Sequence, residues 1–209
     1  MKKNFLRTAG MFALLAVLAT SCKKDAQESF SPAAPKVSNS TAKIAAVPFN
    51  TVLNAAFTTP LSSPGGSAGY WGDVYYDLAN NTTTSTESSA QALFNGTFDG
   101  NINGANGYNL AYKDVTGTSL EAISQSALTG ANAVTTLGSN TSTPGWYVYN
   151  VTTHTLGAVA NRYAVLYKGS SVAAATELYV LQIVNVGYTA DGSSSNFFGQ
   201  ISFRFKKLV

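Results

Sequence analysis

Side chains that could ligate a metal or act as strong nucleophiles are scarce in this chain of 209 residues. It contains one cysteine, Cys22, one histidine, His154, and two methionines, against eleven tyrosines. A single cysteine excludes disulfides within the chain, and also zinc or iron–sulfur sites built from several cysteines. Imidazole is the commonest metal ligand of proteins, so His154 is the first side chain to consider for metal binding.

The remaining polar residues predict no catalytic site. A Ser–His–Asp triad could be assembled only around His154, and such triads are recognised by geometry rather than by abundance. Asp73 and Asp77 are the nearest pair of carboxylates, and we interpret both as solvated surface groups. The glycine-rich stretch 96–107 lacks the Lys-Ser/Thr ending of a phosphate-binding loop and is interpreted as hairpin turns. We therefore expect a protein that is not an enzyme.

The N-terminal residues have the pattern of a secretion signal. Lys2, Lys3 and Arg7 precede an apolar run, residues 11–19, which is much shorter than the roughly 20 residues of a membrane-spanning helix. Small residues then lead to Cys22, so this segment resembles a lipobox, in which the cysteine thiol is acylated before cleavage. We predict a signal peptide over residues 1–21 and a lipid anchor on Cys22.

Cleavage before Cys22 changes the overall charge. Three of the 13 basic residues lie in the signal, whereas all 10 acidic residues follow Cys22. The mature chain is therefore close to neutral, which argues against nucleic acid as a partner. Residues 22–47 lack apolar periodicity and are predicted to be a flexible linker, and residues 48–209 a single domain. Lys23, Lys24 and Asp25 resemble the charged leader of surface lipoproteins of the Bacteroidetes, which implies the outer membrane, with the domain exposed at the cell surface.

The predicted domain is rich in Tyr, Phe, Val, Thr, Gly and Asn and poor in Glu, Lys and Arg, which favours strands and turns. Strands are predicted at 51–57, 69–78, 92–98, 108–113, 146–151, 162–168, 177–188 and 197–207. The run 177–188 is apolar on both faces, which predicts a central strand, and residues 201–206 alternate as in a half-buried strand. A short helix is predicted at 119–128. The expected fold is mostly β, a single antiparallel domain with at most one short helix.

The segment from Gly145 to Leu156, GWYVYNVTTHTL, resembles a signature of the HmuY family of haem-binding lipoproteins, a Trp-Tyr-x-Tyr strand leading into a Thr-His turn. The resemblance continues through strands like 162–167 and 178–183 to an aromatic closing strand, 201–205. The sequence therefore resembles this family firmly over about its last 65 residues and more loosely before them. Two departures are a missing proline after the Thr-His turn and a blurred upstream core motif, 91–94.

The resemblance implies a HmuY-like fold, and a protein that captures haem or a related tetrapyrrole and passes it to an outer-membrane receptor. Members of the family commonly use two axial ligands drawn from histidine and methionine. The mature chain has only His154 for this role, so the options are His154 alone, His154 with a tyrosinate, a tyrosine alone, or no axial ligand. The candidate tyrosines are Tyr108, Tyr112, Tyr147, Tyr149 and Tyr163.

Two alternatives remain open at this point. His154 can be a structural residue that bonds a neighbouring backbone group at a hairpin, or it can be a ligand. The whole domain can bind haem or another small hydrophobic ligand, or it can be a non-catalytic binding or structural lipoprotein on the same fold that recognises a glycan, a peptide or an envelope partner. The scarcity of iron ligands favours the second function more than the resemblance alone does.

Overall fold

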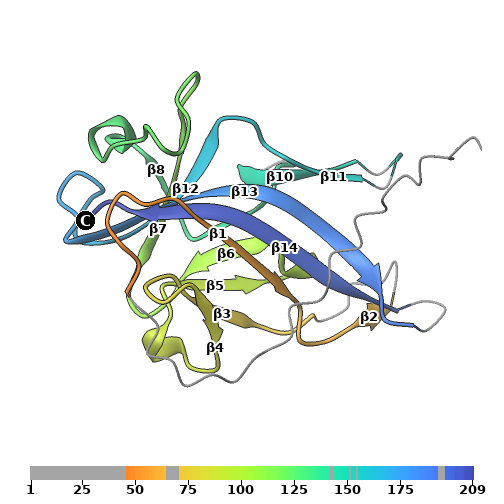
Figure 1. Ribbon diagram of the computed structural model, residues 1–209. Helices are drawn as coiled ribbons and strands as arrows, with labels where there is room; N and C mark the ends of the chain where they lie inside the picture. Colours follow the sequence, from red (N-terminus) through yellow and green to blue (C-terminus); the bar gives the residue numbers. More distant parts are fainter. Residues whose placement is uncertain (1–45, 65–70, 142–143, 151, 154, 193–195) are drawn as a thin grey trace, which may run out of the picture. The chain divides into compact units, whose positions relative to one another are not determined.

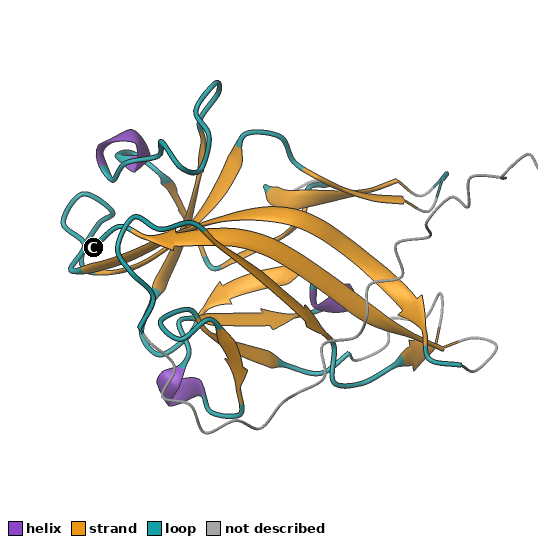
Figure 2. Ribbon diagram, in the orientation of Figure 1, coloured by secondary structure: helices purple, strands orange, loops and turns teal. Residues whose placement is uncertain are grey.

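The computed structural model describes residues 46–64, 71–141, 144–150, 152–153, 155–192 and 196–209 (Figure 1). All of them belong to one compact unit. Strands dominate it, and the described helices are three short 3₁₀ turns (Figure 2): η1 (Glu87–Ser89), η2 (Thr97–Asp99) and η3 (Ser126–Leu128). In this part of the chain no helix is long and apolar enough to cross a membrane.

The strands form two sheets. The first has the order β1 (Leu53–Thr58), β14 (Asn196–Lys207), β13 (Glu177–Ala190), β12 (Arg162–Lys168), β7 (Asn109–Asp114) and β8 (Asn132–Val134), with β2 (Ser63–Pro64) also paired to β14. The second has the order β11 (Thr155–Ala158), β10 (Gly145–Asn150), β9 (Thr136–Ser139), β6 (Asn101–Gly104), β5 (Ala92–Asn95), β3 (Val74–Asp77) and β4 (Thr82–Thr84). The pairing of β9 with β10 is parallel, and the other strand pairs are antiparallel.

The mostly β, mainly antiparallel fold is therefore confirmed. Each of the eight predicted strands overlaps a strand of the structure. The prediction at 69–78 is too long, since β3 begins at Val74 and residues 69–70 lie outside the described residues, and the one at 92–98 runs into η2. The sequence did not predict β2, β4, β6, β8, β9 and β11, which are two to four residues long. Such short strands contain too few residues to show a period of two.

The main core lies between the two sheets, because side chains from both belong to one buried cluster. Phe94 of β5 stacks on Phe203 of β14, with ring centroids 5.3 Å apart, and also on Trp146 of β10, at 6.2 Å. Trp146 and Phe94 are fully buried and Phe203 is 1% exposed. Aromatic rings in offset contact bury a large apolar area in this way, so these three rings join the sheets.

A second core covers the opposite face of the first sheet. Tyr163 and Val165 of β12 pack there, while the alternate residue Ala164 faces the main core. Side chains from the segment 115–131 complete this second core, including Leu120, Ile123 and Leu128. Burial on both faces explains why the run 177–188 begins with apolar residues on both sides, and β13 is indeed a central strand, between β12 and β14.

The predicted helix at 119–128 is absent from the structure, which has turns followed by η3 in this segment. Glu121 explains why the segment stays close to the sheet, because its carboxylate pairs with Arg204 and its carbonyl oxygen accepts a hydrogen bond from Lys206 Nζ over 2.9 Å. Lys206 does lie on the face opposite Phe205, as the alternation predicts. It is only 2% exposed, however, so that face is not open to solvent at this position.

Among the described residues, the far half of β13 pairs with a strand on one side only. β12 pairs with β13 from Glu177 to Leu181, whereas β14 pairs with it as far as Ala190. Between Gln182 and Ala190, β14 is thus the strand partner of β13 among the described residues. β13 and β14 form a long ribbon (Figure 1), which carries the core at one end and the aromatic cluster described below at the other.

Candidate functional site

The sequence-predicted site residues lie in different parts of the fold. Cys22 and His154 fall outside the described residues. Of the five candidate tyrosines, Tyr147 and Tyr149 lie in β10, Tyr112 in β7, Tyr163 in β12, and Tyr108 just before β7. Tyr108 and Tyr147 contribute to the main core and Tyr163 to the second core, on the other face of the first sheet. The structure therefore does not bring the five tyrosines together in one site.

Tyr108 is held in a polar network. Its hydroxyl donates a hydrogen bond to Glu177 Oε2 over 2.6 Å, and Lys168 Nζ lies 4.7 Å from the centre of its ring. Burial raises the pKa of Tyr108, and the hydrogen bond to Glu177 and the Glu177 charge raise it further. This phenol stays protonated at neutral pH, which opposes its use as a tyrosinate ligand.

Tyr163 and Tyr112 are also engaged within the domain. The Tyr163 hydroxyl donates to the carbonyl oxygen of Thr118 over 2.7 Å, and burial raises its pKa. The ring of Tyr112 lies beneath the Arg162 guanidinium, 4.7 Å from ring centre to Cζ. Both tyrosines thus have structural contacts that account for their presence.

The two β10 tyrosines differ in exposure. Tyr147 is 3% exposed, its ring lies against Gly100, and burial raises its pKa. Tyr149 is 36% exposed. It pairs in register with Leu156 between β10 and β11. His154 of the predicted Thr-His turn, between these strands in the sequence, lies outside the described residues. Of the five candidate tyrosines, Tyr149 is therefore the most exposed to solvent.

Asp73 and Asp77, the two carboxylates that were predicted to be solvated, differ in their exposure. Asp73 is exposed, as predicted, but Asp77 is only 7% exposed, which corrects the prediction of a solvated side chain. Its Oδ1 and Oδ2 accept hydrogen bonds from the backbone N and the Nδ2 of Asn80, over 3.1 and 2.7 Å. Asp77 thus stabilises the turn after β3.

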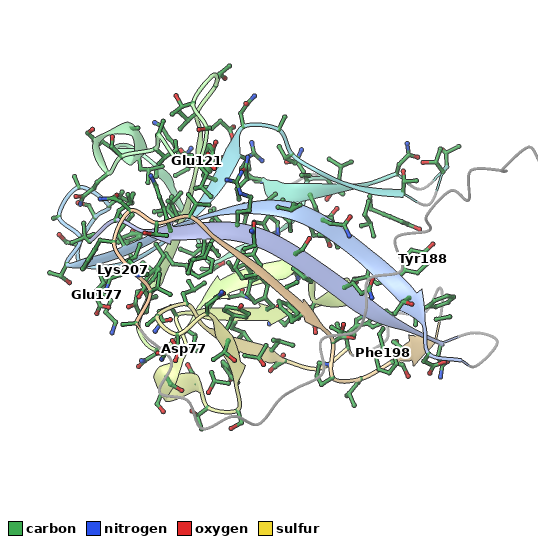
Figure 3. The ribbon with its side chains drawn as sticks, in the orientation of Figure 1. Asp77, Glu121, Glu177, Tyr188, Phe198 and Lys207 are labelled. Atoms are coloured by element: carbon green, nitrogen blue, oxygen red, sulfur yellow. The ribbon has the colours of Figure 1, made fainter. Side chains whose placement is uncertain are left out.

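An aromatic cluster lies at the far end of the β13–β14 ribbon. Trp71 contacts Phe98, with ring centroids 4.9 Å apart, Phe98 stacks on Tyr188 at 5.5 Å and 20°, and Tyr188 meets Phe197 edge-on at 5.3 Å. We call these four residues the aromatic site. Figure 3 labels Tyr188 and Phe198 at this end of the ribbon, and Glu177 and Lys207 at the other. Tyr188 is 45% exposed, so the site reaches solvent.

The backbone is strained where Phe98 enters this site. Phe98 and Asp99 both have left-handed conformations, with φ of 58° and 51°, and each costs a non-glycine residue about 1–3 kcal/mol. The turn packs closely on β14, because a Cβ on Gly199 would lie 2.5 Å from the carbonyl oxygen of Phe98. Neighbouring contacts therefore fix this conformation, and strain of this kind is common in binding sites.

Three side chains at this end have buried polar atoms without a hydrogen-bond partner in the described part of the chain. They are Ser63 through Oγ, Trp71 through Nε1, and Asp99 through both carboxylate oxygens. Burial, followed by the nearby charge of Asp73, raises the pKa of Asp99 to about 8. Buried polar groups are nearly always paired, so unpaired ones call for a specific explanation.

Sequence reasoning missed this site. Trp71 lay at the start of a predicted strand and Phe197 in another, but nothing in the sequence indicated that their ends meet. The sequence also contains a Gly-x-Ser-x-Gly motif, at residues 65–69, which is the pattern of a nucleophile elbow. They lie outside the described residues, and the next described element is the strand β3 rather than the helix that a nucleophile elbow requires.

Within the described residues, no group of three His, Cys, Asp or Glu side chains could hold a metal ion. The chain matches no protein-family model, and no curated protein matches it.

Proposed function

We propose that this protein is a non-catalytic binding lipoprotein of the outer membrane, anchored through Cys22, and that the aromatic site binds a flat ring ligand. The observation that carries the proposal is the stack of Phe98 and Tyr188, which continues a buried aromatic chain from Trp71 out to solvent. Ring ligands stack on such surfaces, and binding sites are mostly apolar with a few polar groups.

The proposed ligand is haem or a related tetrapyrrole, and the resemblance of residues 145–205 to the HmuY family supports this choice. The aromatic site suits the face of a porphyrin ring. The axial position is more restricted, since the hydroxyls of Tyr108 and Tyr163 already donate to Glu177 and Thr118. His154 therefore remains an axial candidate from the sequence, together with Tyr112, Tyr147 and Tyr149, which these two bonds do not involve.

The second candidate function is recognition of a glycan, a peptide or an envelope partner on the same scaffold. It is favoured by the chemistry of the described residues, which contain no histidine, cysteine or methionine. A flat sugar face also stacks on exposed aromatic rings, so Tyr188 would serve this function as well.

A hemin titration distinguishes the two functions. Residues 23–209 are suitable, because both hydrophobic cores lie within the described part of this segment. A saturable change in the Soret band is expected, weakened about tenfold by Tyr188→Ala. Val184→Ala is the matched control, because Val184 is a 53%-exposed apolar residue of the same strand outside the aromatic site. His154→Ala tests axial ligation separately.

The broad spectrum of loosely bound hemin, unchanged by Tyr188→Ala, would overturn the haem proposal. The same Tyr188 and Val184 variants would then be screened against glycans, which tests the second function with the same pair of proteins.

A further inference from the structure

The unpaired atoms at the aromatic site need an explanation that the stacking of rings does not supply. Ser63 is 1% exposed, Trp71 is 3% exposed and Asp99 is fully buried, so water does not satisfy their polar atoms as it would at the surface. Each such group costs about 1–3 kcal/mol when it is left without a partner. Three such groups at one end of the described structure call for a partner from outside the described residues.

Ser63, Trp71 and Asp99 are each linked to the rings of the aromatic site, either by a direct contact or by their position in the chain or sheet. Asp99 directly follows Phe98, whose ring contacts Trp71. Asp99 also lies close enough to Asp73, two residues after Trp71, for the charge of Asp73 to act on it. Ser63 pairs in register with Phe197, the last ring of the cluster.

The chemistry of the three groups is that of hydrogen-bond donors. The indole Nε1–H of Trp71 can only donate, and the hydroxyl of Ser63 can donate. Because burial and the charge of Asp73 raise the pKa of Asp99 to about 8, its carboxyl carries a proton at neutral pH and can donate as well. Three donors without an acceptor suit an anionic oxygen group on a ligand.

The close packing of the turn keeps Asp99 in place. The backbone N–H groups of Asp99 and Gly100 donate to the carbonyl oxygens of Gly96 and Thr97, over 3.1 and 3.0 Å. The carbonyl oxygen of Gly100 in turn accepts a hydrogen bond from Trp146 in the main core. The backbone of the turn that carries Asp99 is thus held in place by the scaffold, which lowers the entropy cost of ordering this part of the site on binding.

We infer that Ser63, Trp71 and Asp99 form an anchor for a carboxylate carried by the flat ring ligand of the aromatic site. This inference rests on the proposed function and narrows its ligand to aromatic ring systems with a carboxylate side chain. The three donors are covered in this structure, so a side chain must move when the ligand enters. Tyr188 is 45% exposed, so moving its side chain removes less buried contact area than moving a more deeply buried ring of the cluster would. We therefore expect Tyr188 to be the side chain that moves.

The test uses iron-free protoporphyrin IX, which carries two carboxylates, and its dimethyl ester, which carries none. Both are titrated by porphyrin fluorescence against residues 23–209 and the Trp71→Phe variant. Phenylalanine keeps a ring against Phe98 but has no N–H. The wild type is expected to bind the acid about tenfold more tightly than the ester. Trp71→Phe is expected to weaken binding of the acid several-fold more than binding of the ester, so that the preference for the acid falls.

Asp99→Asn and Asp99→Ala give a second, independent comparison. Asparagine keeps an N–H donor, so it is expected to retain most of the preference for the acid, whereas alanine is expected to lose it. Circular dichroism of each Asp99 variant checks that the domain is still folded.

Equal binding of acid and ester by the wild type would overturn the anchor and leave the proposed function standing. A loss of both ligands in Trp71→Phe with folding intact would also overturn it, because the indole would then act through its ring. Binding of neither porphyrin by the wild type would overturn the anchor and the tetrapyrrole proposal together.

Discussion

The indole Nε1–H of Trp146 donates a hydrogen bond to the carbonyl oxygen of Gly100 over 2.7 Å. Trp146 belongs to β10 and is fully buried, while Gly100 directly follows the strained turn that carries Phe98 and Asp99. A side chain of the main core therefore holds the backbone next to the aromatic site. A substitution that breaks this hydrogen bond is expected to affect both the stability of the domain and the conformation of the site.

We expect Trp146→Phe to lower the free energy of unfolding by about 2–4 kcal/mol, because it leaves a buried carbonyl unpaired and opens a cavity. Urea unfolding followed by circular dichroism measures the change. Trp71→Phe is the matched control, since the Trp71 N–H has no partner among the described residues and its loss should cost less. Equal losses for the two substitutions would contradict the role given to the Trp146 bond.

Gly199→Ala tests the close approach of the turn to β14. A Cβ at this position would lie 2.5 Å from the Phe98 carbonyl oxygen and 2.7 Å from Thr59 Cγ2, so we expect a loss of about 1–3 kcal/mol. Gly157 of β11 has no atom within 4 Å of its added Cβ. Gly157→Ala should therefore change the midpoint of thermal unfolding very little, and similar shifts for both variants would argue against the contact.

Asp99 should make the domain less stable as the pH rises. Its pKa is raised from 3.8 to about 8 in the folded protein, so the folded state holds a proton that the unfolded state has lost between those two values. The free energy of unfolding of the wild type then falls by up to about 1.4 kcal/mol per pH unit through this group. Asp99→Asn removes the titration.

Urea unfolding of wild type and Asp99→Asn at several pH values between 4 and 8 measures this effect. The stability of the variant relative to the wild type should grow with pH over that range and level off above about 8, where Asp99 is ionised in both states. Parallel stability curves would show that Asp99 titrates normally.

Arg162 joins the two sheets. Its Nε and Nη2 donate to the two carboxylate oxygens of Asp114 in the first sheet, over 2.7 and 2.8 Å, and its Nη1 donates to the carbonyl oxygen of Gly145 in the second, over 2.7 Å. Lysine cannot reproduce this fork, so we expect Arg162→Lys to cost about 1–2 kcal/mol in urea unfolding.

Asp114→Asn is the control for Arg162→Lys, because it removes the ion pair and keeps the bond to Gly145. The Asp114 side chain is 50% exposed, so its loss should cost under about 1 kcal/mol. The hydrogen bond from Arg162 lowers the pKa of Asp114. The contribution of the pair is therefore present above about pH 4 and lost as the pH falls through that lowered pKa. A larger loss in Asp114→Asn than in Arg162→Lys would contradict the sheet-joining role.

The long strands could be predicted because their residues follow the period of the sheet. Ile201, Phe203 and Phe205 alternate with polar residues and all three are buried. The helix predicted at 119–128 is absent because apolar spacing does not distinguish a helix from successive turns that bury the same side chains. The left-handed conformation of Phe98 and Asp99 could not be predicted from the sequence. Neither residue type favours a left-handed backbone strongly enough for that.

The aromatic site could not be predicted for a different reason. Trp71, Phe98 and Tyr188 come from three separate parts of the chain, and their rings meet only through strand register and a tight turn. The tyrosines chosen from the sequence lay near His154 or in the strands of the HmuY-like pattern. Two of them, Tyr108 and Tyr163, instead donate hydrogen bonds within the domain.

Within the described part of the chain, β13 pairs with a strand on one side only beyond Leu181. This part of the strand can therefore be followed by hydrogen–deuterium exchange. In an antiparallel strand, alternate amides point to opposite neighbours. Between Gln182 and Ala190, the amides directed toward β14 should exchange slowly, and those directed away from it quickly, apart from the irregularity at Ile183–Asn185. A ligand that stacks on Tyr188 would leave this alternating pattern intact, whereas an extended chain docking along the strand would erase it.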